Sequence, residues 1–376
     1  MISLNNSTTE KLNLTINSVI DRLDLSDELK ENKKLILRDW EEAVNDSDTF
    51  QSILEICNKF NYYSPNITSE TYDKLFLESK IENENFDKFV NSAFFMPLRR
   101  HSRIETSLEM VSQFRLTNNI NISKIYLDGP IVYMKKYFLR YIEIMPKIET
   151  LEADVSNLNR IISNLKKQAK SYEKDINIYK KITKEIEKNE YNLNKIQVEM
   201  KHTIEEFNNK YFRVKNIVII DDFIGTGDSG VKFLKKLSIE LKKLKTDINF
   251  HLWVLESSED GLNRISAEAK KLGINLDIKY GRMSMSVLDG VSSNSEELKT
   301  KLNDLMRSYR IPISRYSLNH ALSTYVNAPN NNLALLSNKG DNWTPLFLRI
   351  KRVEEKIIIN TEETKDIILN MKRLKK

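Results

Sequence analysis

A long interior segment without glycine or proline restricts the fold of this chain more than any other feature. The sequence holds nine glycines and seven prolines, and neither residue occurs between Pro146 and Gly225. Within that interval apolar side chains recur every seven residues. The longest series is Leu151, Leu158, Leu165, Tyr172, Tyr179, Ile186, Leu193, Met200 and Phe207. A sustained seven-residue repeat keeps one stripe of a helix against a partner helix, so this segment is predicted to form a coiled coil.

A second apolar series accompanies the first but stops partway. It comprises Ile148, Val155, Ile162, Ala169 and Ile176. Polar side chains then interrupt it at Thr183, Glu190 and Gln197. This interruption favours a helical hairpin or a bent pair of helices over one continuous rod, and the polar stretch 187–192 is one candidate for the turn. The helices could pair within one chain, across a dimer or with another protein, and the sequence leaves that choice open.

Charge and cysteine content exclude several classes of protein. Lysine and arginine outnumber aspartate and glutamate by 59 to 53, a net charge of +6 that is too weak to predict nucleic-acid binding without a local basic cluster. The single cysteine, Cys57, rules out an internal disulfide framework and is expected to be a packing residue. The four histidines (His101, His202, His251 and His320) lie far apart, so carboxylates are better candidates than a zinc-type cluster for holding any metal.

The start of the chain resembles no export signal. It lacks a basic segment followed by an apolar one, and no stretch of about 18 apolar residues occurs that could span a membrane. We therefore expect a soluble cytoplasmic protein without a membrane contact.

The spacing of apolar residues changes near residue 92. Residues 1 to about 90 place apolar side chains three or four apart, as helices do. Short strand-like runs follow, at residues 92–98, 122–127, 217–220 and 248–255, with helical patterns between them. Strands that alternate with helices indicate an α/β core around a parallel sheet.

These patterns predict five parts of the chain. They are an N-terminal helical region (1–91), the first part of the core (92–147), an inserted coiled coil (148–210), the second part of the core (211–350) and a C-terminal helix (351–376).

The segment 216–230 carries the most chemical information. Four apolar residues of a predicted buried strand lead into Asp221 and Asp222, and a turn containing Gly225 and Gly227 precedes an amphipathic helix. Ligands of open parallel sheets bind beyond the carboxyl ends of the strands. Glycines let the backbone approach such a ligand, and the N-terminus of the next helix directs unpaired N–H groups at it. The pattern therefore predicts a phosphate cradle beside two carboxylates, which suits a sugar phosphate and could admit Mg²⁺.

Over about 13 positions this segment resembles the phosphoribosyl diphosphate (PRPP) signature of type I phosphoribosyltransferases. The resemblance implies that Asp221 and Asp222 bind the ribose hydroxyls, with Mg²⁺ arriving together with PRPP. It also implies that the turn holds the 5′-phosphate, through Gly225, Thr226, Gly227, Asp228, Ser229 and Gly230. Phe223 is bulkier than the aliphatic residue usual at its position.

Three other interpretations of the turn are less favoured. A Walker A loop would need a lysine inside the turn, and the first lysine is Lys232. A receiver domain also places paired acids at a strand end but does not need the Gly-Thr-Gly that follows. The third is a plain structural turn in which Asp221 caps a loop.

A second resemblance is looser. The segments 330–336 and 343–349 are similar to the ending of phosphoribosyltransferase-like proteins that are proposed effectors of bacterial antiphage systems, some linked to retrons. It implies a hood over the ribosyl site with Asn330, Asn331 and Trp343 as candidates, although packing and turn formation are the commoner roles of such residues. By position in the resembled fold, a diphosphate-binding loop is expected at Arg99, Arg100, Ser102 and Arg103.

Weaker candidates complete the set. His101 could transfer a proton, and Tyr280 and Arg282 could line an acceptor pocket, although inert, core or surface roles are commoner for such residues. The basic tail 370–376 could touch RNA or DNA as part of a nucleoprotein, but it also suits the negative end of a helix dipole. No general base is recognisable.

Three functions follow as hypotheses. One is transfer of the phosphoribosyl group of PRPP to an unidentified acceptor. Another is a non-catalytic scaffold that senses PRPP or a nucleotide and signals through its coiled coil to a partner. The third is a pure interaction protein with a degenerate pocket.

Overall fold

The computed structural model describes residues 14–82, 84–98, 106–211, 214–244, 248–289, 291, 295–313 and 319–350. Its helices are α1 (Ile16–Asp21), α2 (Asp27–Val44), α3 (Ser47–Asn58), α4 (Pro65–Glu82), α5 (Phe86–Asn91), α6 (Ser107–Thr117), α7 (Gly129–Tyr141), α8 (Met145–Ser171), α9 (Ile176–Tyr211), α10 (Asp228–Leu241), α11 (Glu259–Leu272), α12 (Ser295–Ser308) and α13 (Ala334–Ser337), with a short 3₁₀ helix at Ile122–Lys124. Its strands are β1 (Asn61–Tyr63), β2 (Ala93–Pro97), β3 (Asn216–Ile224), β4 (Asn249–Ser258), β5 (Leu276–Ser284) and β6 (Leu322–Thr324).

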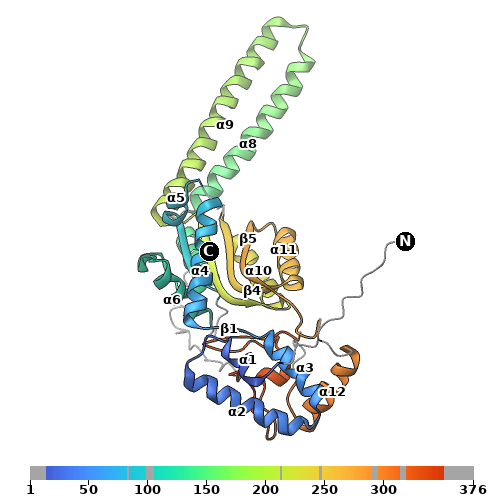
Figure 1. The fold of residues 1–376 in the computed structure, drawn as a ribbon. Helices are drawn as coiled ribbons and strands as arrows, with labels where there is room; N and C mark the ends of the chain where they lie inside the picture. The colour runs from blue at the N-terminus through green and yellow to red at the C-terminus, as the bar shows by residue number, and fades with distance from the viewer. Residues whose placement is uncertain are drawn as a thin grey trace, which may run out of the picture.

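A four-stranded parallel sheet in the order β2-β3-β4-β5 forms the centre of the molecule (Figure 1). Alternate residues of β3 point to opposite faces, as the pleat requires. Ile217 and Ile219 pack with apolar residues of α7, α10 and α11, whereas Val218 and Ile220 pack with those of α4 and α6. Both faces are therefore covered, which explains the nearly continuous apolar run of this strand. The predicted α/β class with a parallel-sheet core is confirmed.

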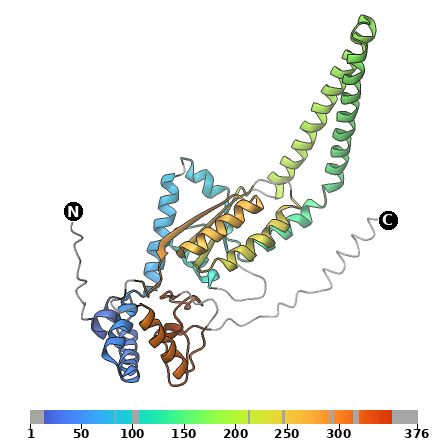
Figure 2. The same cartoon turned by 90° about the vertical axis from the view of Figure 1, so that its right-hand side faces the viewer.

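A second unit, which we call the cap, consists of α1–α3, β1, β6, α12 and α13. It lies at the carboxyl end of the central sheet (Figures 1 and 2). Residues from both ends of the chain build it, because β1 pairs in parallel with β6 and the two halves share one apolar core. Trp343 belongs to that core, is 2% exposed, and stacks on Trp40 with ring centroids 4.6 Å apart.

Helices α8 and α9 form a long antiparallel hairpin that projects from the core, away from the cap (Figure 1). Ion pairs join the two helices between Lys166 and Glu190, at 2.7 Å, and between Lys147 and Glu199, at 3.4 Å. The predicted helical hairpin is present, but the suggested turn at 187–192 is wrong because that stretch lies inside α9.

The turn of the hairpin instead follows Tyr172. The side chain of Asp175 accepts hydrogen bonds from the backbone N–H groups of Asn177 and Ile178 and so caps the start of α9. The polar side chains at 183, 190 and 197 therefore lie inside a continuous helix and mark no break, and Glu190 among them pairs with Lys166 of α8.

Two further expectations have definite outcomes. Residues 122–127 were predicted as a strand but begin as the 3₁₀ helix, and only Ile125 forms a parallel bridge, to Phe95. The predicted helical N-terminal region is present, interrupted by β1. Across the described part of the chain, no helix combines the length and apolar character needed to cross a membrane.

Some expectations concern segments beyond the described residues. They are the diphosphate-loop candidates Arg99, Arg100, Ser102 and Arg103, His101, and the C-terminal helix with its basic tail. The proposed boundaries between the five parts of the chain stay predictions.

Candidate functional site

The acid pair lies at the carboxyl end of β3, an inner strand of the sheet. Asp222 is 9% exposed, and its two carboxylate oxygens accept hydrogen bonds from the Thr106 hydroxyl at 2.7 Å and from the Phe223 N–H at 2.8 Å. Asp221 is partly exposed, and its backbone carbonyl accepts a hydrogen bond from the Tyr72 hydroxyl at 3.0 Å. The two carboxylates therefore sit at the edge of the sheet where a ligand would approach.

The acid pair affects the pKa of the buried hydroxyl of Tyr72. Burial raises the pKa of its hydroxyl well above the ordinary value, and the carboxylates of Asp222 and Asp221 raise it further. The phenol therefore stays protonated and keeps donating to the strand that carries the acids. This contact helps to hold the end of β3 in place.

The turn after β3 is held by side chains of α11 and its N-cap. Ser258 donates a hydrogen bond to the carbonyl of Gly225 at 2.6 Å. Arg264 donates to the carbonyl of Thr226 at 2.7 Å and to the carboxylate of Asp228 at 2.6 Å. Gly227 has φ +73°, a left-handed conformation that glycine adopts without the strain of a side chain. These contacts hold the turn in place beside α11.

Helix α10 begins directly behind this turn. The first N–H groups of a helix lack intrahelical acceptors, so those of Ser229 and Gly230 can bind an anion at the positive end of the helix dipole, whereas the Asp228 N–H donates to the Thr226 hydroxyl at 3.4 Å. The Arg264 ion pair offsets the negative charge of Asp228 next to that site. Gly230 also allows close packing, since a Cβ there would lie 2.4 Å from Ile265 of α11.

The cap reaches the turn through Asn331. A Cβ on Gly225 would lie 2.2 to 2.4 Å from three atoms of the Asn331 amide, so this amide occupies the space of a side chain at position 225. Of the other hood candidates, Asn330 directly precedes Asn331 in the chain and is partly exposed. Trp343 has a packing role instead, because it is enclosed in the cap core and its indole N–H donates to the carbonyl of Leu335 at 3.1 Å.

A buried polar cluster that the sequence reading missed lies beside the acid pair. Glu256 of β4 pairs in register with Phe223, is 1% exposed, and accepts hydrogen bonds from Tyr63 at 2.7 Å and Asn61 at 3.0 Å. Burial raises the pKa of this carboxyl group, an effect that hydrogen bonds from Ser284 and Tyr63 oppose. The sequence could have indicated Glu256, because a glutamate at the end of an apolar strand is unusual.

His320 belongs to the same cluster but carried no local sequence signal. It is 4% exposed, its Nδ1 lies 2.7 Å from the Ser284 hydroxyl, and its ring meets that of Phe223 edge to face at 5.6 Å. Burial lowers the pKa of the imidazole, with a smaller opposing effect from the backbone of Met285. Burial therefore disfavours the charged form of this ring.

The acid pair could take part in holding a magnesium ion. Among the described residues no group of three or more histidine, cysteine or acidic side chains converges as a metal site. The donor chemistry of Asp221 and Asp222 nevertheless fits Mg²⁺, which typically takes one or two carboxylates and completes its shell with phosphate oxygens and water.

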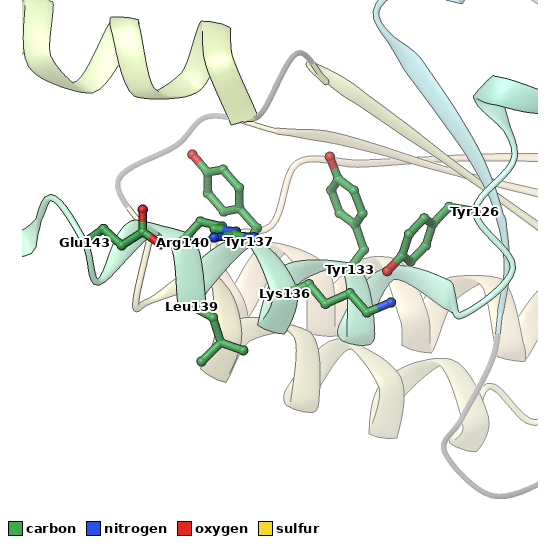
Figure 3. A pocket seen from close by; sticks show the side chains of 7 residues that line it. All are labelled: Tyr126, Tyr133, Lys136, Tyr137, Leu139, Arg140 and Glu143. Carbon is green, nitrogen blue, oxygen red and sulfur yellow. Dashed lines mark hydrogen bonds and ion pairs between the residues drawn. The ribbon is translucent and has the colours of Figure 1, made fainter. Parts of the chain in front are cut away.

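Two hollows lie elsewhere on the described surface. One, of about 730 Å³, runs along α7 and is lined by Tyr126, Tyr133 and Tyr137 with two cations (Figure 3). The other, of about 290 Å³, lies between the cap and β5 and includes Arg282, whose guanidinium donates to Asn61 at 2.7 Å. Neither is lined by the acid pair or the glycine turn, so the candidate site that we describe is the one at the end of β3.

Tyr280, the other acceptor-pocket candidate, lies on β5 and packs partly buried against the apolar core on the α10 side of the sheet.

Comparison with known proteins agrees with this geometry. A protein-family model described as PRTase-CE, a phosphoribosyltransferase-like domain, matches residues 131–349. No curated protein and no solved structure matches the chain. The matched region covers more than half of the chain. It includes the hairpin, the acid pair, the turn, and the cap elements α12, β6 and α13. The chain therefore belongs to the PRTase-CE family of phosphoribosyltransferase-like proteins.

Proposed function

We propose that this protein binds PRPP or a related ribose phosphate at the end of β3. The observation that carries the proposal is the combination of two carboxylates, a glycine turn held by Ser258 and Arg264, and the N-terminus of α10 within one strand-turn-helix unit. Carboxylates accept hydrogen bonds from vicinal hydroxyls, and helix N–H groups bind phosphate. The unit thus offers complementary groups to both ends of a ribose 5-phosphate.

The reaction supported best is displacement of diphosphate from C1 of PRPP by an acceptor. Bound Mg²⁺ would neutralise charge on the diphosphate. The residues of the chain hold the sugar by its hydroxyls and by its phosphate, so that C1 is fixed between acceptor and leaving group. Because positive charge develops on the ribose ring, the nearby carboxylates favour the transition state.

A second candidate function is a non-catalytic sensor, and the position of the hairpin favours it. Helix α9 ends at Tyr211, and β3, which carries the acid pair, begins at Asn216. Ligand binding at one end of β3 could therefore change the position of the hairpin at the other end. On either candidate we propose a role as an effector in bacterial antiphage defence, with the hairpin contacting a second copy or another protein.

The test is a thermal-unfolding titration with PRPP and Mg²⁺. A ligand at about 100 times its dissociation constant stabilises the folded state by about 2.7 kcal/mol, which raises the melting temperature measurably. Asp222→Asn should abolish most of this shift while the free variant still folds, because an amide can keep one acceptor for Phe223 N–H and the Thr106 hydroxyl can rotate to accept.

The matched control is Asp304→Asn, which changes an exposed aspartate of α12 that pairs with Arg307. It should respond to PRPP like the parent. A parent protein that shows no shift, or an Asp222→Asn variant that shifts as much as the parent, contradicts the proposal. Diphosphate release separates the two candidates, since only the transferase releases it.

A further inference from the structure

The hollow between the cap and β5 is lined by two arginines, one from each unit of the molecule. Its volume is about 290 Å³. The cap contributes Arg22, at the end of α1, together with Asp24 and residues of β1. The core contributes Thr71 of α4 and Arg282 of β5. Two guanidinium groups from distant parts of the chain therefore meet at one small cavity.

Arg22 is held in place by the end of α3. Its Nη2 donates hydrogen bonds to the carbonyl of Cys57 at 2.8 Å and to that of Phe60 at 2.7 Å. Both bonds use one nitrogen of the planar fork, so Nε and Nη1 keep their donors for another acceptor. Within the described part of the chain no carboxylate forms an ion pair with this guanidinium.

Arg282 lines the same hollow from the edge strand of the central sheet. Its Nη1 donates to Oδ1 of Asn61 at 2.7 Å, and Nδ2 of Asn61 donates to the buried Glu256 at 3.0 Å. No acidic side chain among the described residues pairs directly with Arg282. Arg264 and Arg307, by contrast, each pair directly with an aspartate. The remaining donors of Arg282 are therefore open to a ligand.

The two guanidinium groups affect each other electrostatically. Partial burial lowers the pKa of Arg22, an effect that Cys57 opposes, and the positive charge of Arg282 lowers this pKa further. Arginine stays charged in spite of such a shift, so the hollow holds two like charges. Asp24 also lines it, where its carboxylate accepts a hydrogen bond from the Ser64 hydroxyl. One carboxylate balances only one of the two cations, and a bound anion would relieve the repulsion between them.

We propose that this hollow binds the phosphate group of a small molecule between Arg22 and Arg282. Guanidinium forks match phosphate oxygens and bind them through paired, charge-assisted hydrogen bonds. The volume lies at the small end of the range for ligand pockets, which suits inorganic phosphate or a short phosphate ester. Because one arginine belongs to the cap and the other to the core, the bound phosphate bridges the two units. Binding here needs neither PRPP nor the acid pair.

The first test is isothermal titration calorimetry with inorganic phosphate and, separately, with glycerol 3-phosphate, at constant ionic strength. The parent should bind both, and the tighter of the two identifies free phosphate or an organic ester as the preferred ligand. In Arg282→Gln the affinity at this site should fall by about tenfold or more, because charge-assisted hydrogen bonds are lost. This variant should melt near the parent, since Arg282 is exposed. The matched control is Arg307→Gln, which changes an exposed arginine of α12 and should bind like the parent.

The second test locates the ligand in the unaltered protein. Phenylglyoxal modifies accessible arginines, and peptide mass spectrometry measures the rate at each of them. Both phosphate compounds should slow the modification of Arg22 and Arg282 several-fold, because one phosphate group contacts both side chains. Arg307 is the internal control, and its rate should not change.

Three results would each overturn this proposal. They are a parent that binds neither phosphate compound, an Arg282→Gln variant that binds both as the parent does, and protection of Arg282 no greater than that of Arg307. The proposed function fails separately, because these assays contain no PRPP. A parent without a PRPP-induced melting shift but with protected Arg22 and Arg282 would refute PRPP binding and leave the phosphate site in place.

Discussion

The contact between Asn331 and Gly225 allows a sharp test of how the cap meets the turn. In Gly225→Ala the new methyl group would lie 2.2 Å from Nδ2, 2.3 Å from Cγ and 2.4 Å from Oδ1 of Asn331. Normal contacts between such atoms exceed about 3.4 Å, so the amide must move by roughly 1 Å or leave the turn. Overpacking of this kind typically costs about 1–3 kcal/mol.

We therefore expect Gly225→Ala to lower the free energy of unfolding by about 1–3 kcal/mol in urea denaturation. The PRPP-induced melting shift should fall as well, because the displaced cap segment no longer covers the turn. The cause is tested by adding Asn331→Ala, which removes the amide that the methyl group meets.

In a double-mutant cycle the two substitutions together should cost less than the sum of the single ones, by about 0.5–3 kcal/mol. Gly273→Ala is the matched control. A Cβ at Gly273 has no neighbour within 4 Å, and only its φ of +67° opposes a side chain, so Asn331→Ala should not rescue it. Additive costs for Gly225→Ala and Asn331→Ala would refute the proposed contact.

Two further predictions concern buried titratable groups. Burial raises the pKa of the Cys57 thiol to about 12, an effect that Arg22 partly opposes. The native protein should therefore react with a thiol reagent such as DTNB far more slowly than the urea-unfolded chain does. Equal reaction rates would contradict the buried position of Cys57. Burial also raises the pKa of Glu256 above its ordinary value of 4.5. Over the pH range between the two pKa values the folded chain keeps the carboxyl proton that the unfolded chain has lost. The free energy of unfolding therefore falls as the pH rises through that range. Glu256→Gln should lose less stability than the parent over the same rise in urea-denaturation series, and an equal loss would mean that another group causes the dependence.

Local patterns in the sequence predicted much of this fold. The heptad repeat identified the hairpin, and the alternation of strands with helices identified the parallel sheet, because both depend on side-chain periodicity within one element. The strand-turn-helix unit at 216–230 was equally readable, since its acids and glycines are neighbours in the chain. The turn of the hairpin was misplaced because a short polar cap at Asp175 has no glycine or proline to mark it.

Only the tertiary structure brought together groups from distant parts of the chain. Glu256, Ser284 and His320 lie on three different segments, and Tyr63 reaches Glu256 from a strand 193 positions away. The cap joins both ends of the described chain through β1 and β6, which places Asn331 on Gly225 and encloses Trp343 in a core. The sequence by itself determined the elements and the acid-rich turn, because these depend on neighbouring residues. The cap, the buried polar cluster and the covering of the turn were decided by long-range packing, for which a single sequence carries no local signal.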